Sequence, residues 1–235
     1  MKLDTRSITG LAMVASVSYV VVMIMNAGGI QVVPGMPMGY EAKDAVLTIG
    51  GFIFGPIGAL MATLIVSFVE MVTVSGTGPI GLIMNFAGSA VYVGAASLVY
   101  QKMRTAKGAV YALVVGSLSM TAIMLPLNYV FLPIYLGMPQ PVVASLLLPM
   151  ILPFNLIKSV LNSAFILLIY KPLVTALRKA NIIAGRPAMD TGRPNGEASA
   201  GSSKFAFNRN LLLVAVAMLA AGVLAMFLLS YFSAG

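Results

Sequence analysis

Apolar residues along this chain come in long runs, separated by short stretches that hold most of the charged side chains. A helix that crosses the hydrocarbon core of a bilayer needs about 20 predominantly apolar residues. The run at 45–74 is too long for one such helix and contains "FGPIG" at 54–58, which predicts a tight turn. The pattern therefore predicts six helices before residue 180, at 8–26, 45–55, 57–73, 79–100, 109–132 and 148–177.

The remainder of the chain divides into two segments. Residues 181–210 are polar and rich in Gly, Pro and Ser, a composition that buries too little apolar surface to offset the entropy of ordering it. Residues 211–232 form one more apolar run, long enough to span the bilayer once. We expect an all-α integral membrane protein: a six-helix domain at 1–180, a flexible cytoplasmic linker at 181–210, and an additional, seventh transmembrane helix at 211–235.

Composition supports this fold class. Only 9% of the 235 residues are charged and 60% are hydrophobic, whereas soluble domains contain roughly 25% charged residues. The net charge is +8, from 14 basic and 6 acidic residues. In a soluble protein such an excess could indicate binding to nucleic acid. Here the basic residues lie between apolar runs, so they indicate membrane topology, and we expect no nucleic-acid partner.

The distribution of basic residues predicts the orientation in the cell membrane. They precede the first run, occupy the 100–108 loop and follow the sixth run. The loops at 27–44, 74–79 and 133–147 hold only one basic residue, Lys43, which lies beside two carboxylates. Because loops rich in Lys and Arg stay in the cytoplasm, the N-terminus and the end of the sixth helix are expected there. The seventh helix would then place the C-terminus outside.

Several kinds of chemistry are excluded by residues that the chain lacks. It has no cysteine and no histidine, so thiol nucleophiles, Ser–His pairs and Cys or His metal sites are impossible. Its three aspartates are not clustered, which disfavours an enzyme that uses Mg²⁺ on lipid phosphates. No G-x-x-x-x-G-K-[ST] phosphate loop occurs, so any ATP hydrolysis must come from a partner. We therefore expect neither catalytic residues nor a metal site. A stand-alone channel or carrier stays open as an alternative, although we see no internal repeat that would favour it.

The sixth run carries polar residues where hydrocarbon is expected, in "LPFNLIKSVLNS" at 152–163. At about 100° per residue, an arc of roughly 140° holds Asn155, Lys158, Ser159, Asn162 and Ser163. The opposite side, with Leu161 and Leu168, is expected to face lipid. An uncompensated lysine in a membrane costs about 2.5–3.5 kcal/mol. Lys158 must therefore meet either a carboxylate, with Glu70 as the candidate from within an apolar run, or a polar ligand.

Other polar residues are expected near the same outer half of the membrane. Asn85 lies in the fourth helix, and Asn128 and Tyr129 lie late in the fifth. Tyr40 belongs to the first long loop, together with charged residues, and this loop could close over a ligand. A single asparagine in a membrane helix more often serves helix packing. Several together suit a heterocycle with N–H and C=O groups, because an amide both donates and accepts hydrogen bonds.

Small residues on the first helix have two possible explanations. Ala12 and Ser16 form a small-xxx-small pair, which lets two helices approach closely. The pair is compatible with packing inside the domain and with docking of a partner helix.

Taken together, these features resemble a known family. Six short helices, the basic 100–108 loop, "FGPIGA", "GLIMNFAG" and "PFNLIKSVLNSAFILLIYKPL" are similar to the substrate-binding (S) components of energy-coupling factor (ECF) transporters. The similarity is greatest to the riboflavin-specific members and spans about residues 5–180. "PFNLIK" is its most specific element. The seventh apolar run is a departure, because the usual members have six helices.

The resemblance implies a non-enzymatic vitamin-binding subunit. It would take up riboflavin from outside, as transported ligand rather than cofactor, and deliver it with a transmembrane coupling subunit and two ATPase subunits. Asn155 and Lys158 would contact the flavin ring, as would Asn128. Tyr40 would close over the ligand. Small residues of the first helix, here Ala12 and Ser16, would dock the coupling subunit. Another vitamin or precursor remains the alternative ligand.

Overall fold

The computed structural model describes residues 5–27, 31–33, 38–179 and 209–234, and these are almost entirely helical. The predicted all-α fold is confirmed. Most of the linker expected at 181–210 lies outside the described residues. In chain order the helices are α1 (Thr5–Ala27), α2 (Lys43–Phe54), α3 (Pro56–Thr73), α4 (Gly78–Met103), α5 (Ala106–Leu136), α6 (Gln140–Leu146), the π-helical turn η1 (Leu147–Ile151), α7 (Leu152–Lys179) and α8 (Arg209–Ala234).

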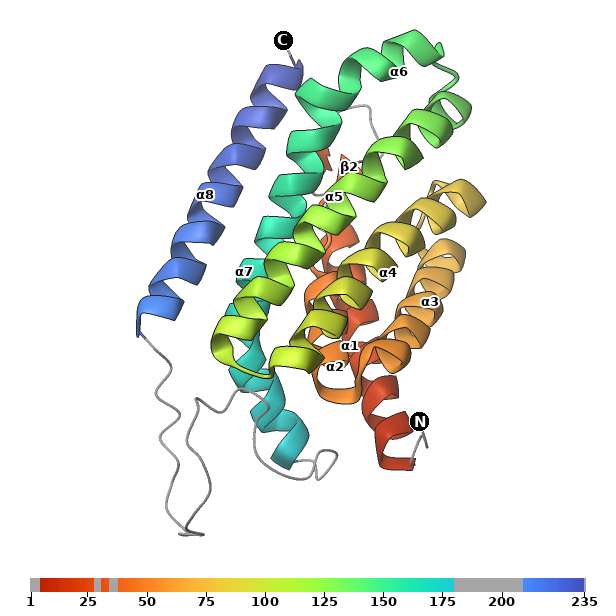
Figure 1. Ribbon diagram of the computed structural model, residues 1–235. Helices are drawn as coiled ribbons and strands as arrows, with labels where there is room; N and C mark the ends of the chain where they lie inside the picture. The colour runs from red at the N-terminus through yellow and green to blue at the C-terminus, as the bar shows by residue number, and fades with distance from the viewer. Residues whose placement is uncertain (1–4, 28–30, 34–37, 180–208, 235) are drawn as a thin grey trace, which may run out of the picture.

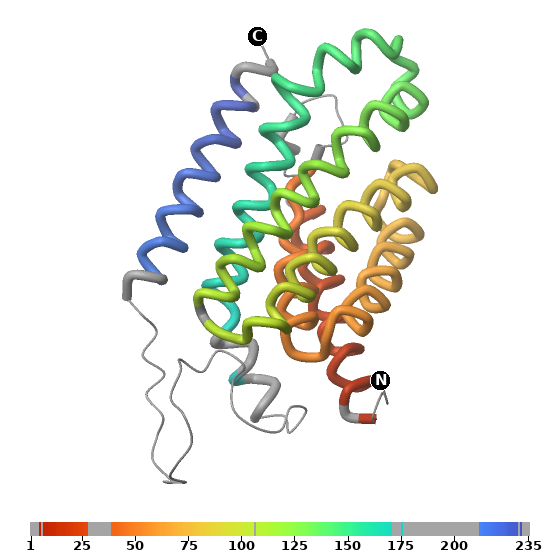
Figure 2. Tube along the Cα trace, viewed as in Figure 1, coloured from red at the N-terminus to blue at the C-terminus, as the bar shows by residue number. Residues whose placement is uncertain are grey.

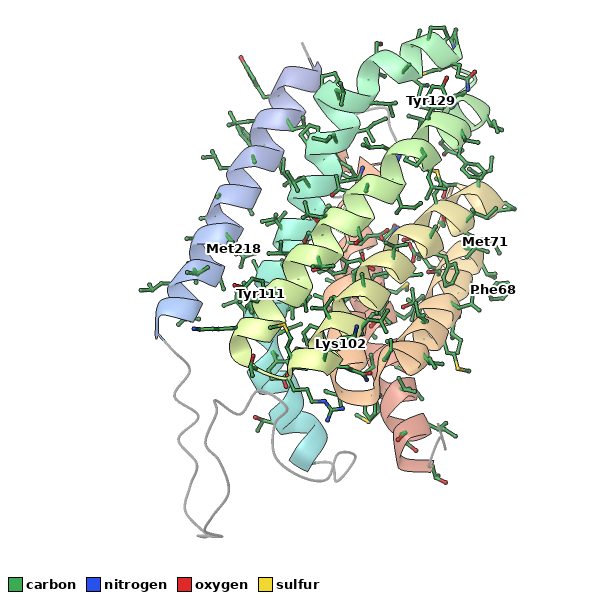
Figure 3. The ribbon with its side chains drawn as sticks, viewed as in Figure 1. Phe68, Met71, Lys102, Tyr111, Tyr129 and Met218 are labelled. Carbon is green, nitrogen blue, oxygen red and sulfur yellow. The ribbon has the colours of Figure 1, made fainter. Side chains whose placement is uncertain are left out.

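Six helices in the described part of the chain are long and apolar enough to cross a membrane. They are Ser7–Ala27, Pro56–Thr73, Gly78–Met103, Lys107–Leu136, Gln140–Tyr170 and Leu212–Leu229. The helix α2 has 12 residues and rises only about 18 Å, against a hydrocarbon core of about 30 Å. Exposed apolar side chains such as Phe68 and Tyr111 cover the outside of the bundle (Figure 3), as a lipid-facing surface requires.

The turn predicted at 54–58 is present between α2 and α3. Gly55 adopts φ 95°, a conformation that favours glycine, and Pro56 occupies the first position of α3. Proline suits that position because backbone N–H groups in the first turn of a helix have no acceptor within the helix. The N–H that proline lacks would therefore make no helical hydrogen bond. The sequence "FGPIG" thus ends one helix and starts the next within a single residue.

Two stretches expected as loops contain regular structure. The first loop holds a short antiparallel pair of strands, β1 (Gln31–Val33) and β2 (Met38–Gly39). The stretch at 133–147 holds the end of α5 and all of α6, joined at Gly137 with φ 67°. The helix α5 continues past its predicted end at residue 132 and contains Pro126 and Pro133 in its interior. Membrane helices tolerate proline because neighbouring groups satisfy the freed backbone carbonyls.

The helices form a bundle with α2 inside it (Figures 1 and 2). Ten consecutive residues of α2, from Lys43 to Phe52, are buried, and the helix contacts α1, α3, α4 and α7. The start of α1 and the end of α8 lie at opposite ends of the bundle (Figure 1). This arrangement is compatible with the predicted topology, in which the two termini lie on opposite sides of the membrane.

The helix α8 packs along α7 (Figure 1). Its contact face includes Ala215, which is fully buried, and Gly222 one heptad later. A Cβ atom on Gly222 would lie 2.5 Å from Leu161 Cδ2, so any larger residue would force the Leu161 side chain to move. Leu161 is 2% exposed. The expectation that Leu161 faces lipid is therefore wrong, because α8 covers that side of α7.

We expect Gly222→Leu to separate α8 from α7, since the added side chain would overlap Leu161. Overpacking of this kind costs roughly 1–3 kcal/mol. Thermal unfolding in one detergent should show a lower Tm than for the wild type. Ala221→Leu is the matched control, because Ala221 is adjacent and exposed. Equal Tm values for the two variants would contradict the packing described here.

Candidate functional site

A cavity of about 280 Å³ lies between the helices, near the lower end of the size range of ligand sites. Its walls come from α1, the segment between β2 and α2, and helices α3, α4, α5 and α7. Apolar side chains make up much of the lining: Val22, Met25, Ile80, Met84, Met120, Met124, Leu132 and Phe154. On α1 and α5 the lining residues lie from the middle of the helix to its end, and on α4 and α7 they lie in the first half; the ends of α1 and α5 point away from the start of α1 (Figure 1). If the N-terminus is cytoplasmic, the cavity is in the outer half of the membrane.

Five of the residues predicted from the sequence line this cavity. They are Tyr40, Asn85, Asn128, Asn155 and Lys158. They come from four different segments of the chain, so the fold gathers them as expected.

Two other predicted residues lie outside the lining. Asn162 is buried behind Tyr40, whose hydroxyl donates to Asn162 Oδ1 at 3.1 Å. Tyr129 is exposed on the surface of α5 (Figure 3). Because consecutive helical residues point about 100° apart, Tyr129 cannot share the inward direction of Asn128.

Two of the asparagines that line the cavity, Asn128 and Asn155, are held by their own helices. Asn155 Nδ2 donates to the Ile151 carbonyl at 2.8 Å, and Asn128 Nδ2 donates to the Met124 carbonyl at 2.7 Å. The Oδ1 atom of Asn155 is buried without a hydrogen-bond partner. An unsatisfied buried acceptor costs about 1–3 kcal/mol. Asn155 thus presents an acceptor that a ligand N–H group would satisfy.

Charged side chains form a chain along one side of the cavity. The Lys43 ammonium, which is fully buried, bonds to the Glu70 carboxylate. Glu41 Oε2 lies 3.1 Å from Lys43 Nζ and 3.9 Å from Lys158 Nζ. The second oxygen of Glu70 accepts from Asn85 Nδ2 at 2.8 Å. Positive and negative groups therefore alternate from α3 across to α7.

This arrangement corrects one of the two sequence alternatives for Lys158. Glu70 does not pair with Lys158, because Lys43 holds it instead. The sequence placed Lys43 in a loop, whereas it begins the buried helix α2. The carboxylate near Lys158 is Glu41, from the loop just before α2.

Glu41 also lines the cavity, whereas the sequence places it only in the first loop, which could close over a ligand. Burial raises the pKa of its carboxyl, but the ammonium groups of Lys43 and Lys158 outweigh burial and lower the pKa to about 2. The group is thus ionised at neutral pH. The charged run "YEAKD" beside an apolar helix was the signal that could have identified it.

The remaining polar residues of α7 serve mainly to join helices. Ser163 Oγ lies 2.8 Å from the Tyr92 hydroxyl of α4 and 3.3 Å from Ser117 Oγ of α5. Asn162 Nδ2 lies 3.4 Å from Asp44 Oδ2 of α2. The polar face of α7 therefore divides into an earlier part that lines the cavity, with Asn155 and Lys158, and a later part that fixes neighbouring helices.

The small pair of α1 points away from the bundle. Ala12 and Ser16 are both exposed, and the Ser16 hydroxyl bonds to the Ala12 carbonyl of its own helix at 2.9 Å. The inward face of α1 instead carries Val14, Ser18 and Val22. Packing of Ala12 and Ser16 inside the domain is therefore wrong, which leaves docking of a partner as the open prediction.

The described residues contain no group of three acidic side chains placed to hold a metal ion. What the cavity offers is an amide acceptor, an ammonium donor, a carboxylate and apolar walls. This set suits reversible binding of a polar heterocycle rather than covalent chemistry.

Comparison with known proteins agrees with this geometry. The riboflavin transporter FmnP of Bacillus subtilis is 25% identical over 195 residues, covering 77% of this chain and all of that protein. RibU of Staphylococcus aureus, also named a riboflavin transporter, is 25% identical over 188 residues, covering 76% of this chain and 95% of that protein. RibU of Streptococcus thermophilus is 34% identical over 107 residues, covering 43% of this chain and 51% of that protein.

A solved structure and a family model complete the comparison. The structure, described as the S component of a bacterial ECF transporter, superposes with a TM-score of 0.61 at 24% identity, covering 73% of this chain and 97% of that one; it supports the fold. The model described as ECF transporter, substrate-specific component, matches residues 6–170. The chain therefore belongs to the family of substrate-specific components of ECF transporters, a transporter subunit and not an enzyme.

Proposed function

We propose that this protein is the substrate-binding subunit of an ECF-type vitamin importer and that its ligand is riboflavin. The observation that carries the proposal is the cavity itself, where Asn155, Asn128 and Lys158 meet between apolar walls. Two relatives that match 77% and 76% of this chain are named riboflavin transporters, which supports the choice of vitamin.

The flavin ring matches the groups that the cavity offers. The ring has carbonyl acceptors and one imide N–H, and its faces are apolar. Asn155 Oδ1 would accept the imide N–H and so gain the partner it lacks. Lys158 would donate to a ring carbonyl. Phe154 and Leu132 supply apolar surface, and Tyr40 closes the wall next to the first loop.

Energy for import would come from partner subunits. The chain has no phosphate loop, so ligand binding needs no ATP, and transport would require a transmembrane coupling subunit and two ATPase subunits. The exposed face of α1 with Ala12 and Ser16 is the expected docking site. In this proposal the N-terminus is cytoplasmic, the cavity opens to the outside, and a linker at 181–210 leads to α8.

We expect Lys158→Ala and Asn155→Ala to weaken riboflavin binding by roughly ten- to a hundredfold each, because a hydrogen bond to the ring is lost. Quenching of flavin fluorescence in a titration of purified protein measures this affinity. Membrane insertion and elution as a single folded species should not change.

Leu156→Ala is the matched control, since Leu156 is adjacent to Asn155 but exposed on α7. It should bind riboflavin like the wild type. If well-folded Lys158→Ala also binds like the wild type, the assignment of the pocket fails. If the wild type binds another vitamin and not riboflavin, the site stands but the choice of ligand is wrong.

We also expect Ala12→Leu and Ser16→Leu to weaken assembly with the coupling subunit while leaving riboflavin affinity unchanged. The larger side chains would prevent close approach of a partner helix. Copurification of the complex and ligand titration of the free subunit measure the two properties. Ala217→Leu on the exposed face of α8 is a control of equal size. Concentrative uptake by this chain alone in proteoliposomes would show the coupling scheme to be wrong.

A further inference from the structure

Each ammonium group beside the cavity faces a carboxylate. Lys43 bonds to Glu70, and Glu41 Oε2 lies 3.9 Å from Lys158 Nζ. Among the described residues, Glu41 supplies the carboxylate within ion-pair distance of Lys158. Glu41 thus lies between the two ammonium groups, 3.1 Å from Lys43 Nζ and 3.9 Å from Lys158 Nζ.

The two pairs differ in how a ligand can reach them. Lys43 is fully buried and does not line the cavity. The side chains of Lys158 and Glu41 are 13% and 24% exposed, and both line it. A ligand can therefore contact both members of the Glu41–Lys158 pair. Of the other pair it can contact only Glu70, because Glu70 lines the cavity and Lys43 does not.

An unpaired lysine in a cavity that is partly shielded from water would favour anions, because an ammonium–phosphate hydrogen bond is strong where water is scarce. Glu41 cancels that preference. Physiological salt screens charges over roughly 8 Å. A cavity with a volume of about 280 Å³ is not much wider than this distance. A phosphate group bound there would experience the Glu41 carboxylate with little screening.

We propose that Glu41 is a specificity-determining residue, which neutralises Lys158 and makes the cavity select uncharged riboflavin over riboflavin 5′-phosphate. The inference rests on the proposed function, because it concerns how that ligand is chosen. A neutral ligand is compatible with the ion pair: an ammonium has three N–H donors and can bond to Glu41 and a ring carbonyl together. A phosphate ester is less compatible, because it brings negative charge into the same cavity as the Glu41 carboxylate.

The test compares the Kd for riboflavin 5′-phosphate with the Kd for riboflavin, by fluorescence titration of the full-length protein. In Glu41→Gln the ratio of the two Kd values should fall about tenfold, mainly through tighter binding of the phosphate ester. Glutamine keeps the size of the side chain and one acceptor oxygen, and Lys43 keeps Glu70 as its partner. The gain should shrink at about 1 M salt, where charges are screened over about 3 Å.

Lys158→Met provides the opposite change and does not depend on how well Glu41→Gln folds. It leaves the Glu41 carboxylate without its cavity cation, so the ratio should rise about tenfold. The double variant Glu41→Gln/Lys158→Met lacks both charges and should return close to the wild-type ratio.

Different results overturn different conclusions. If the wild type binds riboflavin and either single variant keeps the wild-type ratio, Glu41 does not determine selectivity and the inference is wrong. If the wild type binds neither flavin, the proposed function fails, and the inference fails with it.

Discussion

The buried ion pair between Lys43 and Glu70 is the constraint on which the site depends. A charge in a bilayer must be paired, since leaving one partner buried alone costs about 3–5 kcal/mol. Lys43 is the first residue of α2, and Glu70 lies one turn before the end of α3. The pair thus fixes where α2 begins. Because Tyr40 and Glu41 immediately precede α2, their place on the cavity wall follows from the same contact.

A second consequence concerns α7, whose polar face has two different uses. The later part of this face bonds to α2 through Asn162 and to α4 through Ser163. These bonds fix the rotation of α7 about its axis. With that rotation set, Asn155 and Lys158 one to two turns earlier point into the cavity. Lys158 then needs no internal carboxylate from a membrane helix, because Glu41 approaches from the loop. Structural and ligand-binding polar groups on one helix are therefore coupled through its orientation.

The sequence predicts features that depend on local pattern. Apolar runs locate the helices, Gly55 and Pro56 mark the turn between α2 and α3, and one helical face gathers Asn155 and Lys158. Contacts between distant segments were not predictable in this way. Nothing near Glu70 indicates that its partner is Lys43, 27 residues earlier, since Glu70 looks isolated in apolar surroundings and Lys43 already has two carboxylates beside it in the sequence. Likewise, the sequence pattern cannot show that α5 continues through Pro133. A helical wheel cannot show that α8 covers Leu161.

The match to the family model ends at residue 170. The helix α8 lies beyond that match and still packs near the site. Leu219, Met226 and Leu229 of α8 pack against the apolar cluster that contains Tyr40 and Phe154. Both of these residues line the cavity. In a six-helix relative lipid would occupy this side, and lipid tails cannot select one arrangement of side chains as a packed helix does. The same helix also contacts β1 in the first loop. The additional helix is therefore part of the structure that positions the pocket wall, and the binding unit of this chain includes α8 as well as the six-helix domain.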